Sequence, residues 1–562
     1  MIFLSISNLN PGKQLKKYLN TIFETASESL TYLKDQNYTF EIPKIETHGD
    51  LSCNVAMLLT KQLRKNPKEI ANEIIQNLKP DPDIIEKIEI AGPGFINFFF
   101  KPAFVAEIIK EIRTENDSFG KSEKIKGKKA NVEFVSANPT GPLTVGHGRN
   151  AVCGDTIANL LEWIGYDVDR EYYFNNAGRQ MRVLGDSVKY RYLELLGEKI
   201  IFPEDYYQGE YIKEIAKKLF DEHNDKLKEE SAEGIFKAVA EKEIFEDIKR
   251  TLHSLKIDHK IFFNENTLYE EGRIQKLIDV FKDKNLSYEK DGAVWLKLSE
   301  MGEDNSSADK QDKVIIKSTG EPTYRLPDIA YHITKFERNY DLIIDLFGSD
   351  HNATYPDVMA GISSLGYNSE KVKVLIHQFV TILENGEVVK MSTRKANYVT
   401  LDQLIEEVGS DVVRYFFNMR NITTHMNFDL AVAKKQNDEN PVFYLQYAHA
   451  RICSILKMAE KEKLQASVEH ISLLTMDEEQ QLLKKLHQFS NEVLLSAQFY
   501  ETHRICSYLE ELAAAFHKFY TFCRILGTEK NLAEARIALA EATKIVLKNG
   551  LSILSVNAPE RM

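Results

Sequence analysis

The chain has 562 residues, of which 43% are apolar and 28% are charged, and its formal net charge is −12. These proportions are typical of folded globular proteins and exclude a disordered chain, a collagen-like repeat and a small disulfide scaffold. At about 150 residues per domain, the length predicts three to four domains. The acidic balance provides no overall basic field for nucleic acid, so any RNA contact has to come from local clusters.

The five cysteines form no Cys-x-x-Cys pair. This argues against a zinc site and suits a reducing compartment. The first residues place their apolar positions before their lysines, the reverse of a signal peptide. The sequence has no run of about 18 apolar residues, the length that could cross a membrane. We therefore expect a cytoplasmic protein without a membrane partner.

The N-terminal block, about 1–115, is predicted to mix helices with short strands. Residues 54–63 and 67–78 have helical spacing of apolar positions, and Pro67 begins the second segment. The segment IEIAGPGFINFFF is broken by a Gly-Pro-Gly turn between two strand-like runs. A lysine-rich stretch at 120–129 reads as a solvated connector or, as the less favoured alternative, a phosphate-facing loop.

The middle block, about 130–430, alternates strand-like and helical segments. NVEFVSA, DREYYF, DLIIDLFG and VKVLIHQFVTIL are strand-like, and a helix is predicted over 146–163. This alternation predicts a parallel α/β sheet. A charged, mostly helical insert is expected between about 184 and 290. The last block, about 440–562, has almost no strand pattern and predicts a helical bundle.

The first chemical motif is SANPTGPLTVGH, which follows a strand-like run and opens into a helix at Gly146. This geometry directs backbone N–H groups and the positive end of a helix at a bound anion. Gly146 lets a flat ring or a phosphate approach the backbone, and His147 stands where it can donate to a phosphate. By itself, a histidine at a helix start is more often a capping or buried residue.

The second motif is KMSTR, which runs from Lys390 to Arg394. Two cations four residues apart with two hydroxyls between them suit a loop that folds over a polyphosphate. For this pentapeptide alone, a basic surface loop is the favoured alternative. A P-loop and a strand-linked GxGxxG motif, the two familiar nucleotide signatures, are both missing from the sequence.

Together the two motifs resemble the HIGH and KMSKS signatures of class I aminoacyl-tRNA synthetases. EFVSANPTGPLTVGHGRNAVCGD, YYFNNAGRQM, PTYRLPDIAYH, LFGSDH and the C-terminal APERM resemble arginyl-tRNA synthetases. The resemblance covers essentially the whole chain except the insert. One position departs from the family pattern, because Thr144 stands where the first histidine of the HIGH motif is usual.

The resemblance implies an α/β Rossmann-like parallel-sheet catalytic domain over 120–400, with the helical insert at about 184–290. It adds an N-terminal α+β tRNA-binding domain over 1–115, a connecting stem-contact segment over 401–439 and an all-α anticodon-binding domain over 440–562. The expected reaction activates L-arginine with ATP and Mg²⁺ and transfers arginine to the 3′-terminal ribose of tRNA(Arg). Activation is expected to require tRNA, and the protein is expected to be a monomer.

The resemblance also assigns individual residues. The expected catalytic residues are Thr144, Gly146, His147, Lys390 and Arg394. The expected ATP-binding residues are Pro139, Thr140, Gly141, Thr144, Gly146, His147, Lys390, Met391 and Ser392. The expected arginine-binding residues are Glu133, Ser136, Asn138, Tyr324, Asp328, Asp350 and His351. The expected anticodon-binding residues are Tyr444, Gln446, Tyr447, His449 and Arg451, of which only a subset faces RNA. No residue is assigned to a metal.

The residue types also favour arginine as the substrate. A guanidinium is planar and carries five N–H donors, so its pocket needs carboxylates and other acceptors in a fixed arrangement. Tyr324 and Asp328 are four residues apart and share a helix face if that segment is helical, although Pro327 weakens the helix prediction. Such a pocket rejects other amino acids without a second site, so we favour a connective insert over an editing domain.

Two rival functions remain at this stage. A tRNA-binding protein that has lost catalysis would lack the signature cations or the pocket acids, and none of these is lost. A class I synthetase for another amino acid, such as cysteine, would need a zinc-binding cysteine cluster.

Overall fold

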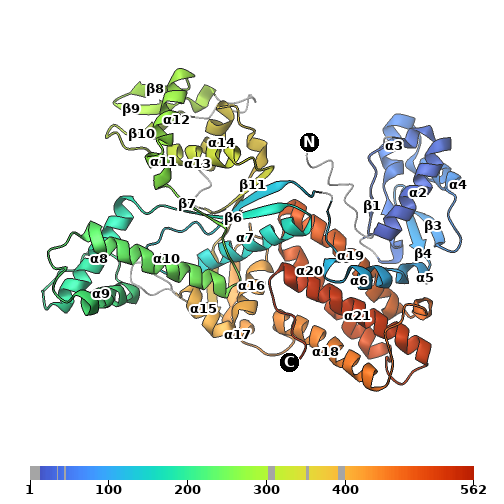
Figure 1. Ribbon diagram of the computed structural model, residues 1–562. Coiled ribbons are helices and arrows are strands. Elements are labelled where there is room, and N and C mark those ends of the chain that lie inside the picture. The colour runs from blue at the N-terminus through green and yellow to red at the C-terminus, as the bar shows by residue number, and fades with distance from the viewer. Residues whose placement is uncertain are drawn as a thin grey trace.

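The computed structural model describes residues 13–34, 36–43, 46–123, 125–300, 311–349, 354–389 and 399–562. The chain forms an N-terminal α+β unit, a central parallel sheet with two attached units, and a C-terminal helical bundle (Figure 1). In this view the N-terminal unit and the first attached unit stand on opposite sides of the molecule.

The N-terminal unit is a four-stranded antiparallel sheet with helices packed on it. The sheet has the order β1-β2-β4-β3. Its strands are β1 (Phe40–Glu41), β2 (Leu51–Cys53), β3 (Ile85–Ala91) and β4 (Phe95–Phe100), and its helices are α2 (Lys13–Ser29), α3 (Val55–Leu63) and α4 (Pro67–Asn77). The two helices and two strands expected from the sequence are confirmed. Gly94 has φ +139°, and a Cβ there would lie 2.9 Å from Cβ of Pro67, so the turn requires glycine.

The central sheet is parallel and has the order β12-β11-β5-β6-β7. Its strands are β5 (Lys129–Glu133), β6 (Asp167–Phe174), β7 (Ile261–Asn264), β11 (Leu342–Gly348) and β12 (Val372–His377). In register, Glu133 pairs with Asp345 on one side and with Glu171 on the other. Chain order reverses at β5, and α7 (Val145–Trp163) follows this strand. Ligands of open α/β sheets bind outside the carboxyl ends of the strands at this switch point.

Two units are attached to this sheet. The first contains α8 (Gly178–Leu195), α9 (Glu210–His223) and α10 (Lys237–Ser254), and it ends where β7 rejoins the sheet. The second unit comprises α11 (Asn266–Glu270), α12 (Arg273–Asp283), β8 (Ser287–Lys290), β9 (Ala293–Leu296), β10 (Lys313–Ile316), α13 (Arg325–Glu337) and α14 (Tyr355–Ser364). The stretch 184–290, expected to be one mostly helical insert, is thus divided by a core strand. Because β7 has only four residues at a sheet edge, its sequence pattern is weak.

The C-terminal half begins with a small sheet of order β14-β13-β15 and continues as helices. The strands are β13 (Val380–Glu384), β14 (Glu387–Val388) and β15 (Met426–Asp429). The helices that link this sheet to the rest are α15 (Leu401–Val408), α16 (Ser410–Asn418) and α17 (Leu430–Ala433). The bundle itself contains α18 (Pro441–Lys461), α19 (Asp477–Phe499), α20 (His503–Phe522) and α21 (Lys530–Ile553). Two further helices, α5 (Pro102–Ala106) and α6 (Ile108–Glu115), pack on this bundle.

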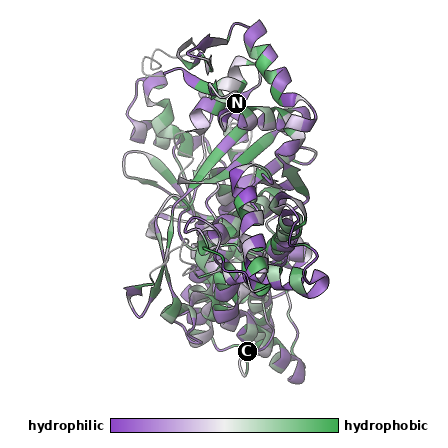
Figure 2. Ribbon diagram, turned by 90° about the vertical axis from the view of Figure 1, so that its left-hand side faces the viewer, coloured by the Kyte–Doolittle hydropathy of each residue, from purple (hydrophilic) through white to green (hydrophobic). Residues whose placement is uncertain are grey.

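Hydrophobic and hydrophilic residues are mixed along the helices (Figure 2). Among the residues that the structure describes, no helix is long and apolar enough to span a membrane. Single-turn helices complete the fold at Thr31–Leu33, Glu46–His48, Asn116–Ser118, Ala232–Phe236, Leu298–Glu300, Ser369–Lys371 and Ile471–Leu473.

Arg414 of α16 joins three parts of the fold at one buried point. Its guanidinium donates at 2.6 Å to the carbonyls of Leu255 and Leu554 and to the carboxylate of Asp155. Leu255 directly follows α10, Leu554 directly follows α21, and Asp155 lies in the middle of α7. The first attached unit, the bundle and the helix after β5 therefore share one fully buried cation.

Candidate active site

The loop after β5 has a strained start that other elements hold in place. Val135 and Ser136 have φ +68° and +44°, which is unusual for residues with a side chain and most unusual for a β-branched one. The Val135 N–H donates to Oδ1 of Asn150 on α7 at 2.6 Å, and the Asn150 amide donates to the Leu346 carbonyl at 2.9 Å. The loop is thus clamped between α7 and β11, as strained backbone at binding sites commonly is.

Thr144 and His147 begin α7 with a reciprocal cap. The Thr144 hydroxyl accepts from the His147 N–H at 3.5 Å, and the Thr144 N–H donates to Nδ1 of His147 at 3.2 Å. Since Nδ1 accepts, a neutral ring carries its proton on Nε2. Burial lowers the pKa of His147, which favours the neutral ring. His147 is therefore poised to donate through Nε2, and the hydroxyl of Thr144 is engaged in capping.

Room for a ligand exists at Gly146. Among the described residues, a Cβ built there would meet only the Thr144 hydroxyl, at an ordinary 3.7 Å. The next two glycines of α7 are different, because a Cβ at Gly148 or Gly154 would lie 2.5 Å from Leu401 or 2.4 Å from Phe134. Gly146 is thus open while the other two permit close packing.

The remainder of the loop is tied to neighbouring elements. Asn138 accepts from the Asn175 N–H at 2.9 Å and donates to Gln180 at 3.0 Å. The hydroxyl of Tyr211 on α9 donates to the Thr140 carbonyl at 2.8 Å and would lie 2.9 Å from a Cβ at Gly141. Pro139 is buried within this loop. The predicted ATP-binding loop therefore rests against the first attached unit.

Asp328 lies in the first turn of α13, one turn after Tyr324, so Pro327 does not interrupt this helix. Tyr324 is 84% exposed, whereas Asp328 is partly buried. Within the part of the chain that the structure describes, the Asp328 carboxylate has no hydrogen-bond or ion-pair partner. Burial, together with the nearby Glu133 and Glu265 carboxylates, raises the pKa of Asp328 to about 7, although the charge of His332 acts in the opposite direction. This acid is suited to receive a cation from outside.

Glu133 is in a different environment, because a buried lysine already holds it. Its Oε2 lies 2.5 Å from Nζ of Lys335, and its Oε1 accepts from the Ser136 hydroxyl at 2.9 Å. Lys335 also lies 2.6 Å from Asp345. The sequence reasoning missed Lys335, although the spacing of Asp328, His332 and Lys335 (i, i+4, i+7) places them on one helix face.

Glu265 was also missed. It follows β7 and accepts from the hydroxyl of Tyr173 on β6 at 2.6 Å. Its charge contributes to the raised pKa of Asp328. Since the residues of β7 have no clear strand pattern in the sequence, the sequence did not indicate that Glu265 lies at the carboxyl end of the sheet.

Several predicted site residues lie outside the described residues: Asp350, His351, Lys390, Met391, Ser392 and Arg394. The described chain resumes at residue 399, and it contacts the first motif. The Leu401 N–H donates to the Leu143 carbonyl at 2.8 Å, and Thr400 pairs with Thr144 in an antiparallel bridge. The start of α15, six residues after the KMSTR motif, is thus hydrogen-bonded to the first motif.

The structure separates the five candidate RNA contacts on α18. His449 is 3% exposed and pairs through Nδ1 with the Pro559 carbonyl at 2.8 Å. Gln446 donates to Asp411 and to the Asn557 carbonyl. Both side chains therefore hold the C-terminal segment in place, which takes the buried His449 ring out of the RNA-facing subset.

The other candidates form an aromatic surface at the exposed side of the bundle. Tyr447 is 37% exposed and lies parallel to the rings of Phe443 and His517. The Arg451 guanidinium lies 4.8 Å from the Tyr447 ring centre and donates to its hydroxyl. Tyr444 packs against His517 from the partly buried side. Exposed aromatics beside an arginine are suited to stack unpaired bases.

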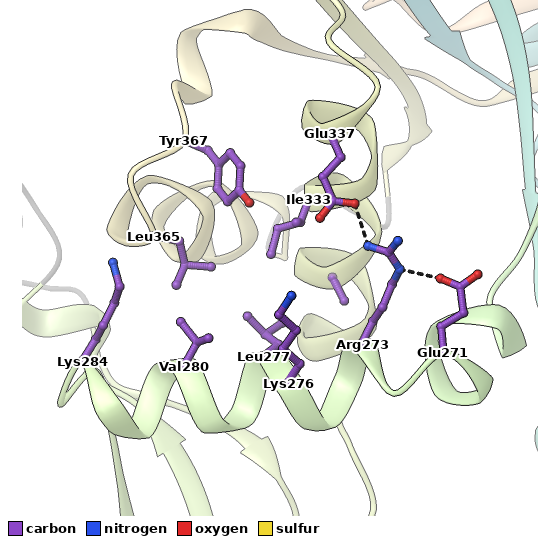
Figure 3. Close-up of a pocket in the computed structure, with 11 residues that line it drawn as sticks. Glu271, Arg273, Lys276, Leu277, Val280, Lys284, Ile333, Glu337, Leu365 and Tyr367 are labelled. Carbon is purple, nitrogen blue, oxygen red and sulfur yellow. Dashed lines mark hydrogen bonds and ion pairs between the residues drawn. The ribbon is translucent and has the colours of Figure 1, made fainter.

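A cavity of about 350 Å³ lies on the other side of α13, between this helix and α12 (Figure 3). Ala330, Ile333 and Glu337 line it, and their spacing puts them on the helix face opposite Asp328 and Lys335. Glu337 and Glu271 pair there with Arg273. The cavity is therefore separate from the candidate active site.

Comparisons with known proteins give one answer for all parts of the chain. The family described as the arginyl tRNA synthetase N terminal domain matches residues 13–100. The class I (R) tRNA synthetase catalytic domain matches 109–424, and the DALR anticodon binding domain matches 445–562.

Three individual proteins illustrate the similarity. The arginine–tRNA ligase of Salinibacter ruber is 47% identical over 568 residues, covering 98% of this chain and 100% of its own. A crystal structure described as a putative arginyl-tRNA synthetase from Campylobacter jejuni is 31% identical, with TM-score 0.75 over 82% of this chain and 100% of its own. The arginyl-tRNA synthetase of Thermus thermophilus, at 21% identity, has the same fold, with TM-score 0.75 over 97% of this chain and 100% of its own. The chain therefore belongs to the arginyl-tRNA synthetase family of class I enzymes, which activate L-arginine with ATP and transfer it to tRNA(Arg).

Proposed function

We propose that arginine and ATP react at the carboxyl end of the central strand β5, between the loop that follows this strand and helix α13. The observation that carries this proposal is the Asp328 carboxylate, which is partly buried and without a partner among the described residues. A carboxylate in such a place loses hydration without compensation until a cation binds. Arginine supplies that cation, and its planar fork matches a carboxylate in a bidentate arrangement.

The pocket has two walls, formed by α13 and by the loop after β5, and they receive different parts of the amino acid. Asp328 and Glu133 face the guanidinium, and the exposed Tyr324 ring closes over it. Asn138 and Ser136 orient the α-amino end from the loop after β5. Asp350 and His351, outside the described residues, complete the assignment. Glu265, with its hydrogen bond from Tyr173, adds a further carboxylate to the guanidinium side.

ATP is assigned to the N-terminal end of α7. Its phosphates meet the N–H groups at the helix start, His147 through Nε2–H, and the cations Lys390 and Arg394. Gly146 leaves the space for this approach. Loop residues 139–141 and the KMSTR residues Met391 and Ser392 contact the nucleotide. Thr144 caps α7 and sets the ring of His147.

The arginine α-carboxylate attacks the α-phosphorus of ATP in line, and pyrophosphate leaves. The ribose hydroxyl at the tRNA 3′ end then attacks the carboxyl carbon of arginyl-adenylate, which forms the ester, breaks the bond to the phosphate oxygen and releases AMP and a proton. No covalent enzyme intermediate is needed. Because both reactants are bound and oriented, positioning can lower the activation free energy by on the order of 7–11 kcal/mol. Mg²⁺ enters with ATP and neutralises phosphate charge. Among the described residues no group of three His, Cys, Asp or Glu lies where it could hold a metal ion.

We further propose that arginine is activated only when tRNA is bound. Reciprocal coupling of this kind requires that both ligands favour one state of the enzyme. Arg414 provides a physical connection, because it joins the end of α21 in the bundle to Asp155 of α7, the helix that carries His147. The dependence of pyrophosphate exchange on tRNA tests this coupling.

The domain roles follow the same assignment. Residues 1–115 contact the outer corner of tRNA, 120–400 catalyse, 401–439 contact the stem, and 440–562 read the anticodon through the aromatic surface around Tyr447. The attached unit of α8–α10 supports the loop through Tyr211 rather than editing products. We place the enzyme in the cytoplasm as a monomer, and sedimentation analysis tests the oligomeric state.

Pyrophosphate exchange tests the function and the coupling together. The full-length enzyme is assayed with each amino acid, with and without tRNA(Arg). We expect exchange with arginine alone and only in the presence of tRNA. Truncation before Asn440 should abolish exchange although every assigned catalytic residue remains. Exchange that is robust without tRNA would refute the coupling, and exchange with another amino acid would refute the pocket assignment.

A further inference from the structure

A group of buried charged side chains lies directly beneath the candidate arginine site, and the distances between them show which cation pairs with which carboxylate. Lys335 is fully buried and lies 2.5 Å from Glu133 and 2.6 Å from Asp345. Both carboxylates are also buried, with 3% and 0% of the residue exposed. A lysine enclosed by two carboxylates stays charged, and these neighbours raise the pKa of Lys335 although burial alone would lower it.

His332 is the second internal cation. Its Nε2 lies 2.9 Å from the Asp345 carboxylate, and its Nδ1 lies 2.7 Å from the Asp328 carbonyl. Both partners are oxygen acceptors, so both ring nitrogens donate and the ring carries a positive charge. Burial opposes this charge, but the adjacent Asp345 carboxylate raises the pKa of His332 above its usual value.

Two internal cations therefore balance two internal carboxylates. Lys335 and His332 pair with Glu133 and Asp345, and among the described residues no cation forms an ion pair with the carboxylate of Asp328. The neighbouring Glu171 has its own partner, Arg338, at 2.9 Å. In the proposed arginine site, the guanidinium of the substrate supplies a cation for Asp328.

The same lysine connects the two walls of the pocket. Through Glu133 it reaches the Ser136 hydroxyl, which also accepts from the Tyr173 N–H at 3.2 Å and so fixes the strained loop that carries Asn138. Through Asp345 and His332 it reaches the main chain of Asp328. We propose that Lys335 is a positioning residue for arginine, which neutralises Glu133 and Asp345 within the protein and sets the loop and α13 at the spacing that the guanidinium requires. This inference rests on the proposed arginine site.

The alternative is that Lys335 only stabilises the fold. Buried ion pairs can often be replaced by apolar residues at little loss of stability, so a network of this kind is not by itself evidence of function. The two interpretations differ in what substitution does to the binding of arginine compared with ATP, since ATP is assigned to α7 and the KMSTR loop.

The experiment compares Lys335→Gln and Lys335→Met with a control, Lys371→Met. Lys371 donates to the Tyr340 carbonyl at 3.1 Å and precedes β12, at the opposite end of the strands from the site. The arginine KM and ATP KM are measured in aminoacylation with full-length enzyme, and thermal melting reports folding. We expect both Lys335 variants to raise the arginine KM at least about 30-fold, as loss of a buried hydrogen-bonded charge does, with ATP KM changed less than about threefold. The control should match wild type.

A second measurement uses Lys335→Ala with small molecules added. An alkylammonium ion should lower its arginine KM, and an alcohol of the same chain length should not, because the site requires charge. Folded variants with an unchanged arginine KM would overturn the proposal, as would equal rises in both KM values. Failure of all three variants to fold would assign Lys335 to stability alone. If wild type itself fails to charge tRNA with arginine, the proposed function fails instead.

Discussion

Replacement of Asp328 by asparagine tests the central assignment most directly. The substitution preserves the size and the hydrogen-bonding reach of the side chain and removes only the charge. Within the described residues no cation forms an ion pair with this carboxylate, and the buried cations nearby, Lys335 and His332, are paired with Glu133 and Asp345. In this variant the guanidinium of bound arginine would therefore have no unpaired carboxylate on α13 with which to pair.

The magnitude follows from the environment of the pair. Loss of one partner of a buried ion pair costs about 3–5 kcal/mol, which corresponds to a factor of about 150–4,000 in arginine KM. ATP KM should change little, because the phosphates are assigned to the start of α7. Asp279→Asn on the exposed side of α12 is the matched control, and it should leave both KM values unchanged.

The pH dependence provides an independent measure. Since the pKa of Asp328 is about 7 in the empty pocket, arginine must bind the ionised form, and arginine KM should rise as pH falls below 7, up to about tenfold per unit. The Asn variant should lack this dependence. Because the folded pKa is raised, the carboxylate also destabilises the empty enzyme as pH rises from about 4 to 7, so the variant should melt above wild type at pH 8 without arginine.

Steady-state aminoacylation from pH 5.5 to 8.5, combined with melting curves, makes these measurements. An arginine KM that is unchanged in Asp328→Asn would remove this residue from the pocket. A raised KM with the same pH dependence as wild type would show that a group other than Asp328 titrates.

Three further substitutions test other parts of the site. Thr144→Val should lower stability by about 1 kcal/mol through loss of the α7 cap and slow adenylate formation, whereas Thr144→Ser should retain both; equal rates for wild type and the valine variant would make Thr144 a spacer. Lys390→Ala should lower single-turnover adenylate formation far more than ATP affinity, because a cationic loop contributes most as pyrophosphate leaves; a rise in ATP Kd alone would contradict this. Tyr447→Ala should raise tRNA KM about 5- to 150-fold with arginine KM constant, since one stacked base contributes about 1–3 kcal/mol; an unchanged tRNA KM would exclude that ring.

The sequence by itself determined the elements and the family. The strand and helix patterns around the Gly-Pro-Gly turn, the strand that leads into α7 and the helical character of the C-terminal block are local properties of hydrophobic spacing and turn residues, so they can be read without tertiary contacts. The two signature motifs and their flanks are also local. The comparisons confirm the arginyl-tRNA synthetase identification made from them.

Only the tertiary structure decided how the charges are distributed among the site residues. Glu133 and Asp328 look equivalent in the sequence, yet Lys335 holds one and leaves the other open. Lys335 is 202 positions from Glu133 along the chain, and the parallel pairing of β5 with β11 brings their elements together. The same holds for Glu265 behind the short strand β7, and for His449, whose burial depends on the C-terminal segment folding back over α18. Charge pairing and burial depend on distances between elements, and the linear order of residues does not contain those distances.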